Sequence, residues 1–455
     1  DLKRIKARLI GKKGKAKKTI EILANVEISI YGKTVSIIGK VENVDVARHA
    51  INNLLLGSGH GKVYAYLEKQ RKLKRWRTME NITAYELAKK QREISISEFF
   101  LKNRHLLGFD NPTRALMMVV KEACDNSLDA TDEINVLPEI KVEVKQINEN
   151  RFIVIIEDNG PGIIKQQIPN IFGKLLYGSK FHLLKQNRGS QGIGISASVM
   201  YSQLTTGKPT KIYSRVSPKK PAHYFELQID TKKNEPNVLK DQEVNWNKDH
   251  GTKIEIEIEG RYLKGKQGVD EYIKQISIVN PHATIIYVTP EKEKITYERV
   301  TEKLPREAKE IKPHPYGIEL GQLITMLKDT QANTLQVFLR SDFSRITPQT
   351  AQEICSKAKL KTSVKPKQLQ DKEIEVLFKS LQEAKIMAPP SNCLSPIGAQ
   401  LLEKSLMKEI KADFYATTSR SPAVYRGMPF IIEVGIAYGG GIEKESQVRL
   451  MRFAN

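Results

Sequence analysis

The stretch that decides the fold is residues 122–130, which read EACDNSLDA. It lies at the end of a segment predicted to be helical, residues 113–130, so Glu122 and Asn126 are four residues apart on one helix face. A carboxylate in this position can orient and deprotonate a water molecule, and an amide oxygen beside it can bind Mg²⁺. A solvated helix face has a similar composition, so the assignment depends on the motifs that follow.

A second motif, EDNGPG at residues 157–162, follows the apolar run 153–156, which is predicted to be a strand. Asp158 at the end of that strand can accept a hydrogen bond from an exocyclic amine such as that of adenine. Gly160 and Gly162 allow the backbone to approach a ligand closely. The alternative is an ordinary turn, in which Asp, Asn and Gly are favoured for their local conformations.

A third motif supplies groups that suit phosphate. Residues 189–196 (GSQGIGIS) open a predicted helix, and the first N–H groups of a helix are good phosphate donors. The G-x-x-G-x-G spacing differs from that of the dinucleotide-binding fingerprint and from that of the P-loop. Upstream, Ser179 and Lys180 supply a hydroxyl and an ammonium that could reach the same phosphates. A fourth motif, HGT at residues 250–252, immediately precedes a predicted strand.

In this order the four motifs resemble those of the GHKL ATPase family, which includes gyrase B, MutL, histidine kinases and the heat-shock chaperone of the ninety-kilodalton class. The resemblance implies a two-layer α/β domain in which the nucleotide lies under a flexible lid beside a mixed sheet. It implies that Glu122 is the general base, that Asn126 holds Mg²⁺, that Asp158 reads adenine and that Thr252 lines the adenine side. Asp129 would only support the first loop. The residues implied to contact ATP are Asn126, Asp158, Gly160, Gly162, Ser179, Lys180, Gly189, Ser190, Gln191, Gly192, Ile193, Gly194, Ile195, Ser196 and Thr252.

The pattern of predicted elements agrees with such a domain between residues 79 and 312. Strands are predicted at residues 140–144, 152–157, 210–214, 224–229, 253–258 and 284–288. Helices are predicted at residues 82–100, 113–130, 192–204 and 269–279. Four more helices are predicted at residues 318–327, 334–339, 348–358 and 372–382, and two more strands at residues 430–438 and 448–453.

Longer segments narrow the resemblance. LYGSK at residues 176–180, KPHPYG at residues 312–317 and VGIAYGG at residues 434–440 look like parts of the B subunit of archaeal DNA topoisomerase VI. This likeness runs from Met79 to Asn455. It implies an α+β multidomain chain with a GHKL ATPase domain at 79–312, a helix–two-turns–helix domain at 313–390 and the N-terminal part of a transducer domain at 391–455.

The same resemblance implies binding partners, and this sequence differs from the family's pattern in one respect. In that family, ATP and Mg²⁺ bring two B subunits together around double-stranded DNA, and a separate A subunit cleaves the other duplex. The family's transducer continues further and carries a lysine that reaches the γ-phosphate, which residues 391–455 lack. We therefore expect ATP binding to persist and hydrolysis to be slow. Because a B subunit could begin at Met79, the residues before it are interpreted as an in-frame fusion.

The segment before Met79 has a G-x-x-G motif of its own, formed by Gly11, Lys12, Lys13 and Gly14. Its glycines let the backbone pass close to a phosphodiester chain and its lysines neutralise that chain. A lone G-x-x-G is common in surface turns. Here the predicted order helix–GxxG–helix–strand–strand–helix resembles a KH domain, and ISIYGKTV at residues 28–35 looks like the second KH domain of the archaeal ribosomal-RNA-processing KH protein. The resemblance implies a KH-like segment at 1–78 that contacts single-stranded RNA. Many KH units serve only as scaffolds, so RNA binding by this copy is left open.

Composition indicates a soluble protein. Of its 455 residues, 40% are hydrophobic and 28% are charged, and no apolar run is long enough for a transmembrane helix, so no membrane partner is expected. The three cysteines are far apart and form neither a disulfide framework nor a metal cluster, which favours the cytoplasm. Lys and Arg number 74 and Asp and Glu 52, for a net charge of +22. Residues 1–78 alone carry a net +13, which indicates either a surface that binds polyanions or a solvated basic face.

Two functional hypotheses follow. The first is the ATP-hydrolysing gate of a type IIB topoisomerase. The second is an RNA-binding KH protein with an inactive or uncoupled ATPase module. DNA binding that requires ATP favours the first, whereas RNA crosslinking confined to residues 1–78 favours the second. A histidine kinase shares the ATP site, but no histidine lies in a recognisable phosphoacceptor helix before the first motif.

Overall fold

The computed structural model describes residues 2–80, 88, 91, 93–189, 192–265, 268–442 and 448–453. The chain divides into two compact units, Asp1–Glu93 and Ile94–Asn455, and each has a hydrophobic core of its own. No described helix is long and apolar enough to cross a lipid bilayer.

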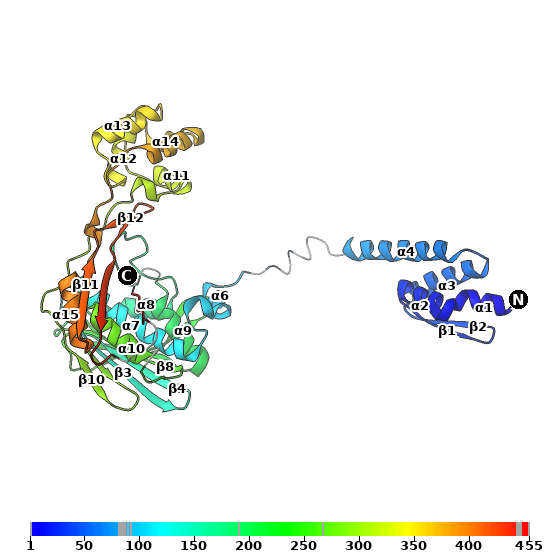
Figure 1. Cartoon of the computed structure of the whole chain (residues 1–455), viewed down its shortest axis with the longest axis horizontal. Helices are drawn as coiled ribbons and strands as arrows, with labels where there is room; N and C mark the ends of the chain where they lie inside the picture. Colours follow the sequence, from blue (N-terminus) through cyan, green and yellow to red (C-terminus); the bar gives the residue numbers. More distant parts are fainter. Residues whose placement is uncertain are drawn as a thin grey trace. The chain divides into compact units, whose positions relative to one another are not determined.

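The first unit packs helices against an antiparallel hairpin (Figure 1). Its elements are α1 (Leu2–Ile10), α2 (Lys15–Ala24), β1 (Glu27–Tyr31), β2 (Thr34–Ile38), α3 (Val41–Leu55) and α4 (His60–Glu80). Gly32 begins the two-residue turn of the hairpin with a φ of 57°, a conformation that glycine adopts without strain. Ile20, Ile28, Leu54 and Leu67 are among the buried side chains of the core. The predicted order helix–GxxG–helix–strand–strand–helix is confirmed.

The second unit is built on an eight-stranded sheet in the order β10-β9-β3-β4-β8-β5-β6-β7. The strands are β3 (Glu139–Asn148), β4 (Arg151–Glu157), β5 (Thr210–Arg215), β6 (Ala222–Asp230), β7 (Glu235–Val244), β8 (Gly251–Glu259), β9 (Thr284–Val288) and β10 (Lys294–Tyr297). The pair β3 and β9 is parallel, and the other neighbours pair antiparallel. The sheet is therefore mixed, as predicted.

Helices cover one face of this sheet (Figure 1). They are α7 (Pro112–Glu133), α8 (Ile168–Gly173), α9 (Gly194–Thr206) and α10 (Val269–Val279), and α6 (Ile96–Lys102) precedes them in the chain. On β3, Ile140, Val142 and Val144 are buried while the residues that alternate with them are not, which is the pattern of a sheet packed on one side. Helix α7 begins where the Asn111 side chain accepts hydrogen bonds from the first backbone N–H groups, with Pro112 at its first position.

A helical region and a small strand region follow the sheet. The helices α11 (Leu320–Asp329), α12 (Leu335–Asp342), α13 (Pro348–Lys357) and α14 (Asp371–Glu383) share their own apolar core. The last part holds α15 (Ala399–Glu409), β11 (Phe414–Ser419), β12 (Ala423–Tyr425), β13 (Met428–Phe430) and β14 (Glu433–Tyr438). Leu402 and Leu406 of α15 pack on Ile278 of α10 and so join this part to the sheet domain.

Most predicted elements of the second unit are confirmed, with four exceptions. Residues 448–453 form no strand, and Val448 is exposed, so the apolar pattern there was misleading. The helix predicted at 82–100 lies in part outside the described residues, and its described end begins only at Ile96, after Ser95 caps it. The strand predicted at 430–438 is split in two between β13 and β14. Helices α8 and α15 and strands β7, β10, β11 and β12 were not predicted, and β7 is an exposed edge strand without apolar alternation.

Candidate functional site

Asp158, directly after β4, is the buried centre of the candidate site. Its side chain accepts hydrogen bonds from the Ser127 hydroxyl at 2.9 Å, from the Gly160 N–H at 2.9 Å and from the Thr252 N–H at 3.0 Å. The Asp158 N–H donates in turn to the Thr252 carbonyl at 2.9 Å. Burial raises the pKa of Asp158, and the three hydrogen bonds offset this only in part. Residues of the first, second and fourth motifs therefore meet at one carboxylate.

Glycines bring the strand ends together around Asp158. Gly162 has a φ of 69°, and an added Cβ would lie 2.1 Å from the carbonyl oxygen of Arg215. Gly251 has a φ of 139°, and its Cβ would lie 2.3 Å from the carbonyl oxygen of Asp158. Any other residue at these two positions would separate the strands, because the clash is with backbone. From the sequence Gly162 was expected to let the backbone approach a ligand, and in the structure its close neighbour is the Arg215 backbone.

Glu122 lies on α7 against the first residue of α9. An added Cβ on Gly194 would lie 1.7 Å from Glu122 Oε2, so the carboxylate rests on the backbone where α9 begins. Burial raises the pKa of Glu122, and the charge of Lys121 offsets part of the rise. A carboxylate with a raised pKa beside the start of a helix can accept a proton close to an anion held by that helix.

The predicted phosphate segment lies along α7 beyond Glu122. Asn126 is exposed, and its Oδ1 would lie 3.6 Å from a Cβ on Gly189. Gly192 has a φ of 57°, and its Cβ would lie 2.8 Å from the Tyr177 carbonyl oxygen. Ile193 and Gly194 are partly exposed. Ser190 and Gln191 lie outside the described residues.

The side chains of Ile195 and Ser196 are turned into the protein. Ile195 is part of the apolar core, and the buried Ser196 hydroxyl donates to the Ile193 carbonyl at 3.0 Å. Only their backbone N–H groups, in the first turn of α9, suit phosphate. This restricts what the sequence predicted for these two residues to backbone contacts.

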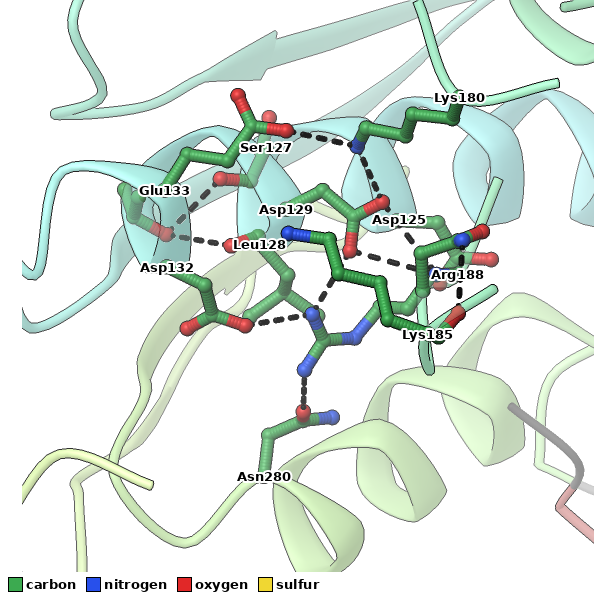
Figure 2. Close-up of polar contacts among 12 residues, drawn as sticks. Asp125, Ser127, Leu128, Asp129, Asp132, Glu133, Lys180, Lys185, Arg188 and Asn280 are labelled. Carbon is green, nitrogen blue, oxygen red and sulfur yellow. Dashed lines mark hydrogen bonds and ion pairs between the residues drawn. The ribbon is translucent and has the colours of Figure 1, made fainter. Parts of the chain in front are cut away.

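Of the two upstream residues, Ser179 is exposed and Lys180 is paired. The Lys180 ammonium lies 2.7 Å from Asp129 and 3.2 Å from Glu133, both on α7 (Figure 2). Along α7, Glu122, Asn126, Asp129 and Glu133 occupy positions i, i+4, i+7 and i+11, so they form one stripe. Described residues contact this stripe at several points: Gly194 lies at Glu122, Gly189 lies near Asn126, and Lys180 is paired with Asp129 and Glu133.

Two residues at this site were not singled out from the sequence. Ser127 holds Asp158, and Arg188 joins the phosphate segment to Asp129 and Asp132 at 2.9 and 2.7 Å (Figure 2). Ser127 follows Asn126 in the first motif, and Arg188 directly precedes the third, so their positions were a usable signal. Asp129, which was expected only to support a loop, is shared by Lys180 and Arg188.

Helix α7 also supplies a candidate ligand for Mg²⁺, the side chain of Asn126. The part of the chain that the structure describes contains no group of three His, Cys, Asp or Glu side chains that could hold a metal ion. Magnesium bound with a nucleotide needs only one or two protein oxygens, because phosphates and waters complete its shell. The exposed amide oxygen of Asn126, facing the phosphate segment, fits that smaller requirement.

In the first unit, the G-x-x-G loop presents its lysines to solvent. Gly11 and Gly14 have φ values of 72° and 79°, and an added Cβ on Gly11 would lie 2.6 Å from the Ala16 Cβ. Lys13 also has a positive φ, 55°. Both Lys12 and Lys13 are exposed. The glycines thus let the loop turn tightly before α2 while the lysines project outward.

Three family models match the chain. Residues 1–72 match the eukaryotic type KH-domain (KH-domain type I). Residues 111–261 match the histidine kinase-, DNA gyrase B-, and HSP90-like ATPase. Residues 389–455 match the transducer of the topoisomerase VI B subunit.

Curated relatives extend these matches over most of the chain. The B subunit of type 2 DNA topoisomerase 6 from Methanococcoides burtonii is 52% identical over 373 residues, which are 82% of this chain and 60% of that protein. The corresponding protein of Halobacterium salinarum strain R1 is 33% identical, and the match covers 83% of this chain and 70% of the relative. The chain belongs to the family of topoisomerase 6 B subunits.

The family resemblance predicted from the sequence is thereby confirmed, and so is the α+β multidomain fold class with its KH, ATPase and transducer parts. The match spans 60% of the length of the Methanococcoides relative.

A solved structure described as the a/eIF2alpha-aDim2p-rRNA complex from Pyrococcus horikoshii OT3 is 45% identical over 16% of this chain and 40% of that chain, with a TM-score of 0.16. The predicted domain boundaries and the roles of the site residues stay predictions.

Proposed function

We propose that this chain is the ATP-binding part of the B subunit of a type IIB DNA topoisomerase. The observation that carries the proposal is the buried Asp158 carboxylate, held by Ser127, Gly160 and Thr252 at the end of β4. A buried carboxylate that is aimed by three donors and keeps further acceptor capacity suits an adenine amine. The match of residues 111–261 to an ATPase model supports this assignment.

The geometry along α7 supports ATP hydrolysis as part of this proposal. Glu122 accepts a proton from the attacking water, and its raised pKa makes it a better base than an exposed glutamate. The backbone N–H groups at residues 192–196 hold the phosphates, assisted by Ser179 and Lys180. Magnesium, held by Asn126 and the phosphates, would neutralise developing negative charge there.

The partners follow from the family. We infer that ATP binding brings two copies of the chain together on double-stranded DNA, and that a separate A subunit cleaves the DNA. The transducer match at residues 389–455 supports such a coupling part, and α15 already packs on α10 of the ATPase domain. The cytoplasm remains the expected location.

A second function is favoured by the G-x-x-G loop. We propose that Gly11, Lys12, Lys13 and Gly14 contact single-stranded RNA. The exposed lysines on a tight glycine turn and the KH match at residues 1–72 support this proposal.

Calorimetric titration of the full chain with ATP and Mg²⁺ tests the nucleotide site. We expect saturable binding by the unsubstituted chain and no detectable binding by Asp158→Asn. The matched control is Asp241→Asn, since Asp241 lies on β7 of the same sheet and is paired with Lys165 at 3.0 Å. Absence of ATP binding by the folded unsubstituted chain, or equal binding by Asp158→Asn, would overturn the proposal. Repeating the titration in EDTA tests the magnesium requirement.

A further inference from the structure

Arg188 is a buried cation at the entrance of the phosphate segment. Its side chain is 13% exposed. One guanidinium nitrogen lies 2.9 Å from Asp129 and 2.7 Å from Asp132, and the other donates to Asn280 Oδ1 at 2.8 Å (Figure 2). The Arg188 N–H also donates to Asp129 at 3.3 Å. Both the backbone and the side chain of one residue are therefore fixed.

The positive charge of Arg188 is balanced by the carboxylates of Asp129 and Asp132. Burial alone would lower the pKa of Arg188, but Asp132 and Asp129 more than offset this and raise it. Burial would raise the pKa of Asp132, but His282 and Arg188 lower it. Removing the guanidinium leaves Asp129 with Lys180 and Asp132 with His282 as partners, and the loss of one cation from this partly dry site is costly.

Arg188 contacts residues from two helical elements. Asp129 and Asp132 belong to α7, and Asn280 directly follows α10. A guanidinium can satisfy these three partners because its donors form a planar fork, whereas a lysine ammonium is a single point charge. Arg188 therefore fixes the start of the phosphate segment relative to both α7 and α10.

Lys180 shares Asp129 with Arg188 but is held differently. Its second partner, Glu133, is 55% exposed, and both of its partners lie on α7 alone. Lys180 can thus leave its carboxylates for a phosphate while Arg188 keeps the segment in place.

We propose that Arg188 is a positioning residue for nucleotide binding, which holds the neighbouring Gly189 beside Asn126 on α7, next to the N-terminus of α9, whose backbone N–H groups at residues 192–196 face the phosphates. The proposal rests on the proposed ATP site. It assigns Arg188 a role toward the phosphates and none toward adenine, which Asp158 would hold. Binding of ATP and of adenosine should therefore respond differently to its loss.

The test compares ATP and adenosine affinities of the full chain by calorimetry, with thermal unfolding in parallel. For Arg188→Gln we expect ATP affinity to fall about tenfold or more, because charged hydrogen bonds are lost, and adenosine affinity to change by less than about twofold. Arg188→Lys should recover part of the ATP affinity, since it keeps the charge without the fork. The matched control is Arg299→Gln. Arg299 is 14% exposed and contacts Glu139 at 3.0 Å and Thr284 at 3.0 Å, at a distance along the sheet from the phosphate segment.

The outcomes distinguish failure of the role proposed for Arg188 from failure of the proposed ATP site. Equal loss of ATP and adenosine affinity in Arg188→Gln, or no loss of either, overturns the role of Arg188 while leaving the ATP site standing. Failure of the unsubstituted chain to bind either ligand overturns the proposed function and this role with it. If Arg188→Gln does not fold, Asp132→Asn removes one partner of Arg188 and should lower ATP affinity by about threefold with adenosine affinity unchanged; an unchanged ratio of the two affinities there contradicts the proposal.

Discussion

The G-x-x-G loop and the α7 site both combine glycine with basic side chains, but they place the charge in opposite ways. Lys12 and Lys13 project into solvent from a loop that turns on its glycines. Lys180 and Arg188 lie against the carboxylates of α7 and are mostly buried. The first arrangement leaves charge free for any polyanion, whereas the second uses charge to set geometry.

This difference has consequences for affinity and specificity. Exposed lysines gain affinity mainly by releasing counterions from the nucleic acid, so binding is strongly dependent on salt and tolerant of sequence. Buried ion pairs lose much of their Coulomb energy to desolvation, but they fix the neighbouring backbone. We therefore expect substitutions in the α7 site to have large effects on one ligand, and substitutions in the loop to have graded effects.

The largest expected effect is that of Glu122→Gln on ATP hydrolysis. Loss of the general base should lower single-turnover hydrolysis by about 100-fold or more, while ATP affinity and RNA affinity stay unchanged. Glu143→Gln is the matched control, because Glu143 on β3 has a side chain 20% exposed, against 21% for Glu122. Hydrolysis at the unsubstituted rate in Glu122→Gln would show that another group takes the proton.

A smaller effect is expected for Gly194→Ala. The new methyl group would occupy the position of Glu122 Oε2, so the carboxylate must move away from α9. Misplacement of a catalytic group by about 1 Å can cost on the order of 100-fold, and we expect a loss of hydrolysis up to that size with little change in thermal stability. Gly321→Ala on α11 is the control, since nothing lies within 4 Å of its added Cβ. Full hydrolysis in Gly194→Ala would mean that Glu122 does not act from this position.

Substitutions in the G-x-x-G loop should have a smaller effect, measured as weaker RNA binding. In Lys12→Gln/Lys13→Asn the charges are removed and the asparagine tolerates the positive φ of residue 13. Fluorescence anisotropy with a labelled single-stranded RNA, between about 50 and 200 mM salt, should show weaker binding and a log–log salt slope reduced by about 1.4. Lys232→Gln/Lys233→Asn makes the same charge change on the exposed end of another hairpin and should leave RNA binding unaltered. An unchanged slope in the loop variant would remove the loop from the RNA interface.

The smallest effect is a shift in pH dependence. Glu122 acts as a base only when deprotonated, so hydrolysis should fall as the pH drops through its raised pKa. Lys121 lowers that pKa, and Lys121→Met should therefore move the acid limb of the hydrolysis profile to higher pH. A shift to lower pH would contradict the assignment of the limb to Glu122, and RNA binding should be indifferent to this substitution.

Motif spacing was enough to place much of the candidate site. Glu122 and Asn126 lie on one face of α7 because helical periodicity places residues four apart together. The meeting of Asp158 with Thr252 could be expected only through the family, since 94 positions separate them in the chain. The Arg188–Asp129 pair, 59 positions apart, depends on how the segment folds back on α7, and periodicity carries no information about that.

The wrong and missing elements have a common cause. The strand predicted at residues 448–453 had the right side chains, but strand formation needs a paired neighbour, which local composition does not reveal. Strand β7 is polar and exposed, yet it forms because β6 pairs along its whole length. Pairing with a neighbouring strand therefore decided both cases: β7 is a strand without an apolar pattern, and residues 448–453 have the pattern without being a strand.

Amide hydrogen exchange on the full chain, with ATP and Mg²⁺ or with single-stranded RNA, tests the central claim that two separate regions bind two anions. We predict that ATP slows exchange at residues 122–130, 158–162 and 192–196 and leaves residues 11–18 unchanged. RNA should slow exchange at residues 11–18 and leave the α7 site unchanged. Protection of the loop by ATP, or no protection of the α7 site by saturating ATP, would contradict the account.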